Sequence, residues 1–207
     1  MNLINKKRVI KIAVSLISLL IVLVIIYYGF LFLRQRNGIE LKPIHKVTAY
    51  NVQTYLQNDD LWGDDKIGMT DYTMSHSGCL VSIIASNLEY QGFKTNPKEL
   101  NGILSKDSVY NEEGEILWEK LVTILPYYKY SAPKQIEVSK IQENLDKGIL
   151  PMVKVRYKRI WGYHWVLIVG ATDEDFLIVD PLNQDKEVIK LSEHGKIFAV
   201  RYLSKAL

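Results

Sequence analysis

Three side chains with nucleophilic or acid–base chemistry stand where apolar runs of this chain begin or end. Cys79 is the only cysteine, His164 opens the run "HWVLIVG", and Asp180 closes the run "FLIVD". A thiolate, an imidazole and a carboxylate are the groups of nucleophilic acyl transfer, in which a histidine activates the thiol and an acid orients the histidine. Each residue alone has a simpler interpretation: a buried apolar cysteine, a satisfied core histidine, and a turn acid before proline. The chemistry therefore depends on elements that bring the three side chains together.

Cys79 lies at the start of a predicted helix. The apolar residues of this segment recur at helical spacing: Leu80, Ile83, Ile84 and Leu88. Gly92 is expected to end the helix. Unsatisfied backbone N–H groups in a first helical turn favour a thiolate over a neutral thiol. Gly78, next to the cysteine, would let backbone or substrate approach closely.

The strands that carry His164 and Asp180 are predicted to form a hairpin. With a period of two, His164 shares a sheet face with Val166. If the loop is centred near Asp173, Asp180 faces Val166 and is the diagonal neighbour of His164. An acid beside a histidine fixes its tautomer and supports its charged form. A slip of one residue in the strand register would remove this contact.

The remaining pattern predicts helices first and an antiparallel sheet second. Helices are expected over 96–105 and 114–125. A third helix is expected to begin at a capping box of Ser139 and Gln142 and to end at Gly148. Strands are expected over 150–158, 164–170, 176–180 and 196–203. This order predicts an α+β fold.

A long apolar segment precedes the globular part. Residues 12–33 carry no charge, and at about 1.5 Å rise per residue a helix of that length crosses a bilayer core of about 30 Å. The length of the run and the lack of a small-x-small cleavage pattern after it favour a retained anchor over a cleaved signal peptide. The basic residues Lys6, Lys7, Arg8 and Lys11 favour a cytoplasmic N-terminus and a main domain outside the cell. We therefore expect a basic cytoplasmic tail at 1–11, the anchor at 12–33, a linker at 34–45 and a globular domain at 46–207.

Charge and cysteine content exclude several classes of function. The net charge is +3, but the first 36 positions hold basic residues and no acid, so the rest of the chain is mildly acidic. Without a basic patch, nucleic acid is a poor candidate partner. One cysteine allows no internal disulfide, and together with four scattered histidines it shows no metal-ligand spacing, so neither a metal nor a cofactor is expected. His76 is interpreted as a loop histidine, because a base so close to Cys79 leaves little room for substrate between them.

Five stretches of the globular part carry a resemblance to a known family. They are "QNDDLWG" (57–63), "SGCLVSIIASNLEYQG" (77–92), "NPKELN" (96–101), "GILPMVKV" (148–155) and "GYHWVLIVGATDEDFLIVDP" (162–181). In these stretches the chain resembles the stand-alone branch of the bacteriocin-processing (double-glycine leader) peptidase-like family of papain-fold cysteine peptidases. The resemblance covers nearly all of the globular part and implies a papain-like α+β peptidase domain over 46–207, preceded by one transmembrane helix.

The resemblance also implies a role for each site residue. Cys79 would be the nucleophile, His164 the general base and acid, and Asp180 the orienting residue. Gln57 would donate its side-chain amide to an oxyanion hole. In the transporter-linked branch this glutamine lies only a few residues before the cysteine, whereas Gln57 stands much farther upstream. An insertion must therefore loop Gln57 back to the site.

The expected function is that of a bacterial membrane-anchored thiol peptidase, acting outside the cell on peptide or protein substrates through a Cys79 thioester. One hydrophobic span and no P-loop pattern argue against a fused transporter, and leave open a separate export transporter as a partner. Two alternatives remain. One is a cell-wall peptide amidase of the NlpC type, or a transpeptidase, on the same fold. The other is a non-catalytic surface module that binds peptide in the same cleft, although such a module has no need of all three reactive groups.

Overall fold

The computed structural model describes residues 3–206, with the side chains of Arg8 and of residues 10–206. Residues 1–2, which belong to the predicted basic tail, and residue 207 lie outside the described residues, as do the side chains of Lys6 and Lys7. The chain divides into two compact units, 1–37 and 38–207, and each is described by itself.

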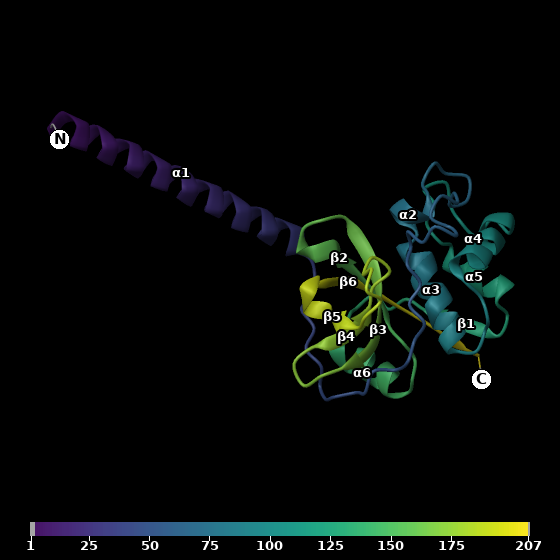
Figure 1. The fold of residues 1–207 in the computed structure, drawn as a ribbon. Helices are drawn as coiled ribbons and strands as arrows, with labels where there is room; N and C mark the ends of the chain where they lie inside the picture. Colours follow the sequence, from purple (N-terminus) through teal and green to yellow (C-terminus); the bar gives the residue numbers. More distant parts are fainter. Residues whose placement is uncertain (1–2, 207) are drawn as a thin grey trace. The chain divides into compact units, whose positions relative to one another are not determined.

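The described part of the first unit contains one helix, α1 (Leu3–Gln35), drawn in purple in Figure 1. Its segment Ile10–Gln35 has a mean hydropathy of 2.8, and its large apolar side chains are exposed. A helix that is apolar on every side needs a protein or lipid environment to cover it. By length and composition α1 can cross a membrane, and a signal sequence would meet the same criteria.

The second unit begins inside the segment predicted as a linker, 34–45. Ile39 exchanges both of its backbone hydrogen bonds with Ile197, at 2.8 and 2.9 Å. The side chain of Leu41 is buried in the core of this unit. The chain after Gly38 is therefore built into the globular unit.

The helices of this unit differ from the sequence pattern mainly at their ends. They are α2 (Met74–Ser77), α3 (Cys79–Tyr90), α4 (Pro97–Lys106), α5 (Trp118–Ile124) and α6 (Val138–Asp146). The start of α4 is as predicted, because the side chain of Asn96 accepts a hydrogen bond from the N–H of Glu99 at 3.0 Å. Helix α5 is shorter than the predicted 114–125, because Ile116 forms a β-bridge with Tyr110 instead.

The predicted capping box of α6 is wrong. Ser139 lies inside the helix, and no side chain caps its first turn. The Gln142 side chain is used in tertiary contacts: its Oε1 accepts from the N–H of Ile44 at 3.1 Å. The predicted stop is present, since Gly148 has a φ of +73° just beyond the helix.

The sheet has six antiparallel strands in the order β1-β6-β2-β3-β4-β5. The strands are β1 (Tyr128–Ser131), β2 (Met152–Arg156), β3 (Tyr163–Ala171), β4 (Phe176–Val179), β5 (Ile189–Lys190) and β6 (Ile197–Lys205). Short 3₁₀ turns, η1 (Tyr157–Arg159) and η2 (Leu191–Glu193), follow β2 and β5. Figure 1 shows α3, α4 and α5 on one side of the unit and strands β2 to β5 on the other, with α3 packed on β3. The α+β architecture is confirmed, although the sequence pattern missed β1 and β5.

The hairpin of β3 and β4 has the predicted register at the end that is close to His164 and Asp180. Leu167 pairs with Val179 and Ile168 with Ile178, which is the register expected from a loop near Asp173. Beyond Ile168 the pairing shifts by one residue through a bulge. The bulge lies toward the loop, so the end that leads to Asp180 keeps its pairing with β3.

Candidate active site

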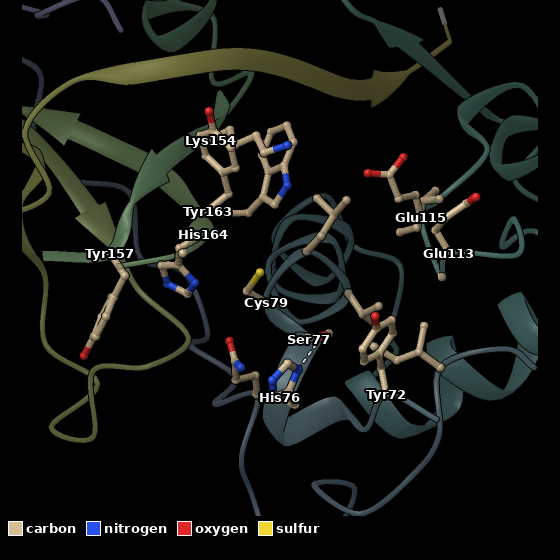
Figure 2. A pocket seen from close by; sticks show the side chains of 18 of the residues that line it. Tyr72, His76, Ser77, Cys79, Glu113, Glu115, Lys154, Tyr157, Tyr163 and His164 are labelled. Atoms are coloured by element: carbon tan, nitrogen blue, oxygen red, sulfur yellow. Dashed lines mark hydrogen bonds between the residues drawn. The ribbon is translucent and has the colours of Figure 1, made fainter. Parts of the chain in front are cut away.

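One pocket of about 750 Å³ gathers the residues selected from the sequence. Cys79, His164 and Gln57 all line it, and the side chain of Cys79 lies between its two sides (Figure 2). Asp180 lies directly behind His164 and is only 2 % exposed. The structure therefore brings together all four residues, although they come from separate parts of the chain.

Cys79 is the first residue of α3, as predicted, and a short helix precedes it. Helix α2 runs into α3 through Gly78, whose N–H donates to the carbonyl of Met74 at 2.7 Å. A Cβ on Gly78 would lie 2.5 Å from that same oxygen, so the junction requires glycine. The backbone N–H groups of Met74 and Ser75 already donate to Asp65 and Gly63. The first turn of α3 itself begins at Cys79, with Gly78 as its N-cap and the N–H of Ser82 donating to the carbonyl of Gly78. Support for a thiolate can therefore come from this turn and from a neighbouring side chain.

That side chain is His164, which lies between Cys79 and Asp180. Its Nε2 is 2.6 Å from Oδ1 of Asp180, and both side chains are almost fully buried. Because Nε2 is used by the carboxylate, Nδ1 is left to make the side-chain hydrogen bond with Cys79. This is the geometry that lets an acid orient a histidine toward a nucleophile.

The electrostatics of this pair favour opposite charges. Burial by itself lowers the pKa of His164, but the hydrogen bonds to Asp180 and Cys79 outweigh burial and raise that pKa to about 9. For Asp180 burial acts to raise the pKa, yet hydrogen bonds from His164 and His194 hold the carboxyl pKa well below its usual range. At neutral pH the buried pair is therefore imidazolium and carboxylate.

The sequence pattern missed a second buried histidine on the same carboxylate. Nε2 of His194 is 3.1 Å from Oδ2 of Asp180, and Nδ1 of His194 accepts the backbone N–H of Lys158 at 3.0 Å. Since a backbone N–H can only donate, Nδ1 carries no proton, and the proton on Nε2 points at Asp180. Oδ1 of Asp180 also accepts the N–H of Leu182 at 2.8 Å. The carboxylate is thus held by three donors.

His194 also connects the site to the turn between β2 and β3. The ring of Tyr157, at the start of η1, lies 5.4 Å from the ring of His164 and 5.5 Å from that of His194. Lys158 and Arg159 in this turn have positive φ angles of 46° and 71°, which non-glycine residues rarely adopt. His194 comes just after η2, where no sequence periodicity marks a site residue. Only its placement next to β4 in the fold reveals it.

Gln57 returns to the pocket despite its distance from Cys79 in the sequence. Its backbone N–H donates to the carbonyl of Pro181 at 3.0 Å, and its Nε2 donates to the carbonyl of Ser75 at 2.7 Å. The residue is 3 % exposed, and its Oε1 has no hydrogen-bond partner. An amide nitrogen carries two hydrogens, so one donor of Gln57 remains available in the pocket.

The pocket walls are rich in aromatic rings. Trp161, Tyr163 and Trp165, which the sequence places around His164, all line the pocket. His76 is exposed in α2 rather than in a loop, stacks on Tyr72 and lies 2.9 Å from the hydroxyl of Ser77. Within the described residues, no group of three or more histidine, cysteine or acidic side chains is arranged to hold a metal ion.

Comparison with known proteins identifies a family. The model of the Peptidase_C39 like family matches residues 49–204, which is more than half of the chain and includes the whole pocket. Among solved structures, a putative C39-like peptidase from Bacillus anthracis is similar, with 13% identity, a TM-score of 0.51, and coverage of 78% of this chain and 98% of its own. The peptidase domain of Streptococcus ComA, described as a bi-functional ABC transporter involved in a quorum-sensing pathway, has 14% identity and a TM-score of 0.42, with coverage of 62% and 91%. The comparison with curated proteins gives no match.

Proposed function

Since this chain belongs to the Peptidase_C39 like family, we propose that it is a cysteine peptidase that hydrolyses peptide bonds through a thioester on Cys79. The observation that carries this proposal is the contact of one buried imidazole with both a thiol and a carboxylate in one pocket. Neither a core cysteine nor a core histidine requires that arrangement. A papain-like active site has this arrangement of thiol, imidazole and carboxylate.

The proposed reaction has two acyl-transfer steps. In the first, the Cys79 thiolate attacks the peptide carbonyl carbon, and the C–N bond breaks as the proton on Nδ1 of His164 passes to the leaving amine. In the second, Nδ1 takes a proton from water, the resulting hydroxide attacks the thioester carbonyl, and the C–S bond breaks to regenerate the thiolate. Asp180 keeps its proton count throughout and holds the imidazole in the productive orientation.

The test in cells compares surface peptides from bacteria that carry the parent protein with those from bacteria that carry Cys79→Ala. Peptides cleaved by the enzyme should end at new termini only in the parent. Identical sets of termini, with both proteins present in equal amount, would favour the non-catalytic binding module over the peptidase.

Gln57 is proposed to donate its free amide hydrogen to the oxyanion that forms on the attacked carbonyl. We expect Gln57→Ala to lower kcat by about 10²–10³ with little change in KM, because the contact is made mainly in the transition state. Gln57→Glu should be at least as harmful, since it places a negative charge beside the oxyanion. Steady-state kinetics with a cleaved peptide measures both. Alkylation of Cys79 should survive in both variants, and unchanged kcat values would move the donor role to another group.

His194 is proposed to be a positioning residue that fixes the second oxygen of Asp180. We expect His194→Ala to lower kcat more than KM and to cost about 1.5–3 kcal/mol of stability, because a hydrogen bond to a buried carboxylate is lost. His194→Gln restores a donor near the position of Nε2, whereas His194→Asn restores an acceptor near Nδ1. Recovery of kcat by His194→Gln and not by His194→Asn would identify the Asp180 contact. Parent-like kcat in folded His194→Ala would reject the role.

Residues 12–33 are proposed to anchor the enzyme in the membrane, with residues 38–207 outside the cell. The basic flank of Arg8 and its neighbours supports this orientation, because positive charge near a span is retained on the cytoplasmic side. Protease added to intact cells or protoplasts should then digest the globular unit. Protection until lysis would reverse the orientation, and release of the unit into the medium would indicate a cleaved signal instead.

A further inference from the structure

The pocket carries two cations to which the proposed hydrolysis gives no task. Lys154 of β2 and Arg201 of β6 both line it. Arg201 pairs with Met152, two residues before Lys154, so the two cations lie on the same sheet face as diagonal neighbours. Trp165 of β3 is the direct cross-strand partner of Lys154 and shares that face. Three neighbouring strands therefore present both cations from a rigid surface.

Aromatic rings hold these cations without neutralising them. Nζ of Lys154 lies 4.6 Å from the ring centre of Tyr163 and 6.0 Å from that of Trp165. The guanidinium carbon of Arg201 lies 5.9 Å from the ring centre of Trp165. A ring face attracts a cation but carries no net charge, so both positive charges remain available to an anion.

No carboxylate of the described residues compensates either charge. Neither Lys154 nor Arg201 forms an ion pair within residues 3–206. Nε of Arg201 is buried without a hydrogen-bond partner, and one terminal nitrogen donates to the carbonyl of Val200 at 2.9 Å. Burial lowers the pKa of Arg201, and the charge interaction with Tyr130 acts in the opposite direction. A partly desolvated guanidinium without an anion is costly, and a bound anion would remove that cost.

The other side of the pocket has the opposite charge. Glu113 and Glu115 lie across the pocket from Lys154 (Figure 2), and both are exposed. An anionic group that enters the pocket is repelled by this acidic side and attracted to the cationic side. The charge distribution thus gives a bound peptide a preferred placement.

We propose that Lys154 and Arg201 form a subsite for a carboxylate of the peptide substrate, close to the bond that Cys79 attacks. The planar guanidinium suits a carboxylate because it can donate two parallel hydrogen bonds, and the ammonium of Lys154 adds a point charge. The carboxylate comes either from an acidic side chain or from a free carboxyl terminus. The inference rests on the proposed function, because it assigns a substrate class to the same pocket.

Binding of peptides to the uncleaving Cys79→Ala full-length chain in detergent micelles tests this subsite. The probes are fluorescein-labelled neutral octapeptides in which a single Glu, or a matched Gln, occupies each position in turn. Each peptide is made with a free and with an amidated carboxyl terminus. We expect Glu to bind at least about 10-fold more tightly than Gln at one position, or the free acid to bind that much more tightly than the amide if the terminus is recognised.

Matched variants assign the preference to these two cations. Lys154→Met and Arg201→Met should each remove most of it, and Arg201→Lys should keep part of it because the charge remains. Lys129→Met, at an exposed position of strand β1 outside the pocket, is the control and should leave the preference unchanged. Thermal unfolding of each variant shows whether it is folded. High salt should weaken the preference, since part of it is a screened charge interaction.

Three results would overturn the subsite: equal binding of Glu and Gln peptides and of acid and amide forms, a preference that survives both methionine variants, or no binding of any carboxylate peptide. Turnover of the same peptides by the parent chain is read separately. Turnover without a carboxylate preference would reject the subsite and keep the peptidase. A carboxylate preference without turnover would keep the binding site and reject the peptidase.

Discussion

Replacement of Cys79 by alanine is expected to abolish peptide hydrolysis and to leave the fold intact. No other cysteine exists in the chain to replace the nucleophile. Loss of a group on which covalent catalysis depends lowers kcat by at least about 10⁴. The side chain is only half-buried, so the free energy of unfolding should change by no more than about 1 kcal/mol.

Internally quenched peptides with a randomised sequence measure this loss whatever the cleavage preference of the enzyme. Cys79→Ser is the matched control, because its hydroxyl fills nearly the same space but does not ionise beside His164. We expect both variants to be inactive and to unfold at nearly the parent temperature. Hydrolysis by Cys79→Ala at the parent rate would show that the reaction uses another residue.

Replacement of His164 is the second change with a very large expected effect. His164→Ala should lower turnover to the level of Cys79→Ala, because in the proposed mechanism only this side chain moves protons between thiol, amine and water. Asp180→Ala should leave measurable activity, since the carboxylate orients the histidine and is not itself protonated in the reaction. Parent-like activity of His164→Ala would end the peptidase account.

Stability must be controlled in this comparison. Removal of one partner from a buried ion pair costs about 3–5 kcal/mol, because the remaining charge is left uncompensated. His164→Gln and Asp180→Asn keep the volume of the side chains. In Asp180→Asn no charge has to stay buried, because His164 can lose its proton. Turnover of all four variants should be measured below their unfolding temperatures, so that a loss reports chemistry and not unfolding.

The raised pKa of His164 also sets an alkaline limit. The imidazolium that we propose protonates the leaving amine is present below about pH 9 and is lost above it, so kcat should fall as the pH rises through that value. The contribution of His164 to stability has the same sign: it is fully present below the ordinary pKa of 6.5 and is lost as the pH rises through about 9. Asp180 acts in the opposite direction, because its pKa is lowered, and its contribution is lost only in acid below 3.8.

The sequence predicts the His164–Asp180 contact because strand periodicity and a hairpin register suffice to place both side chains. It does not predict His194, because that residue follows a short 3₁₀ turn and reaches Asp180 only through the packing of η2 on β4. Local patterns also fail where a tertiary contact competes. Gln142 matches a capping box but bonds to Ile44, and Ile116 matches a helix but pairs with Tyr110.

The environment of Cys79 shows a subtler difference between sequence and structure. Helical spacing correctly starts a helix at this residue, but it does not reveal that α2 leads directly into α3. Gly78 is nevertheless the N-cap of α3, so Cys79 keeps its predicted place in a first helical turn. The side chain of His164 adds a second contact to Cys79, and this contact joins a helix to a strand that lies far away in the sequence.

The pH dependence of Cys79 alkylation by iodoacetamide tests most directly whether Cys79 and His164 act as one nucleophilic pair. Intact-mass measurement follows the reaction at the single cysteine of the full-length chain, in the parent and in folded His164→Gln. We expect fast alkylation of the parent already at about pH 6–7, and a large loss of that neutral-pH rate in His164→Gln. A parent rate that rises only above about pH 8, as for an unassisted thiol, and that His164→Gln does not change would contradict it.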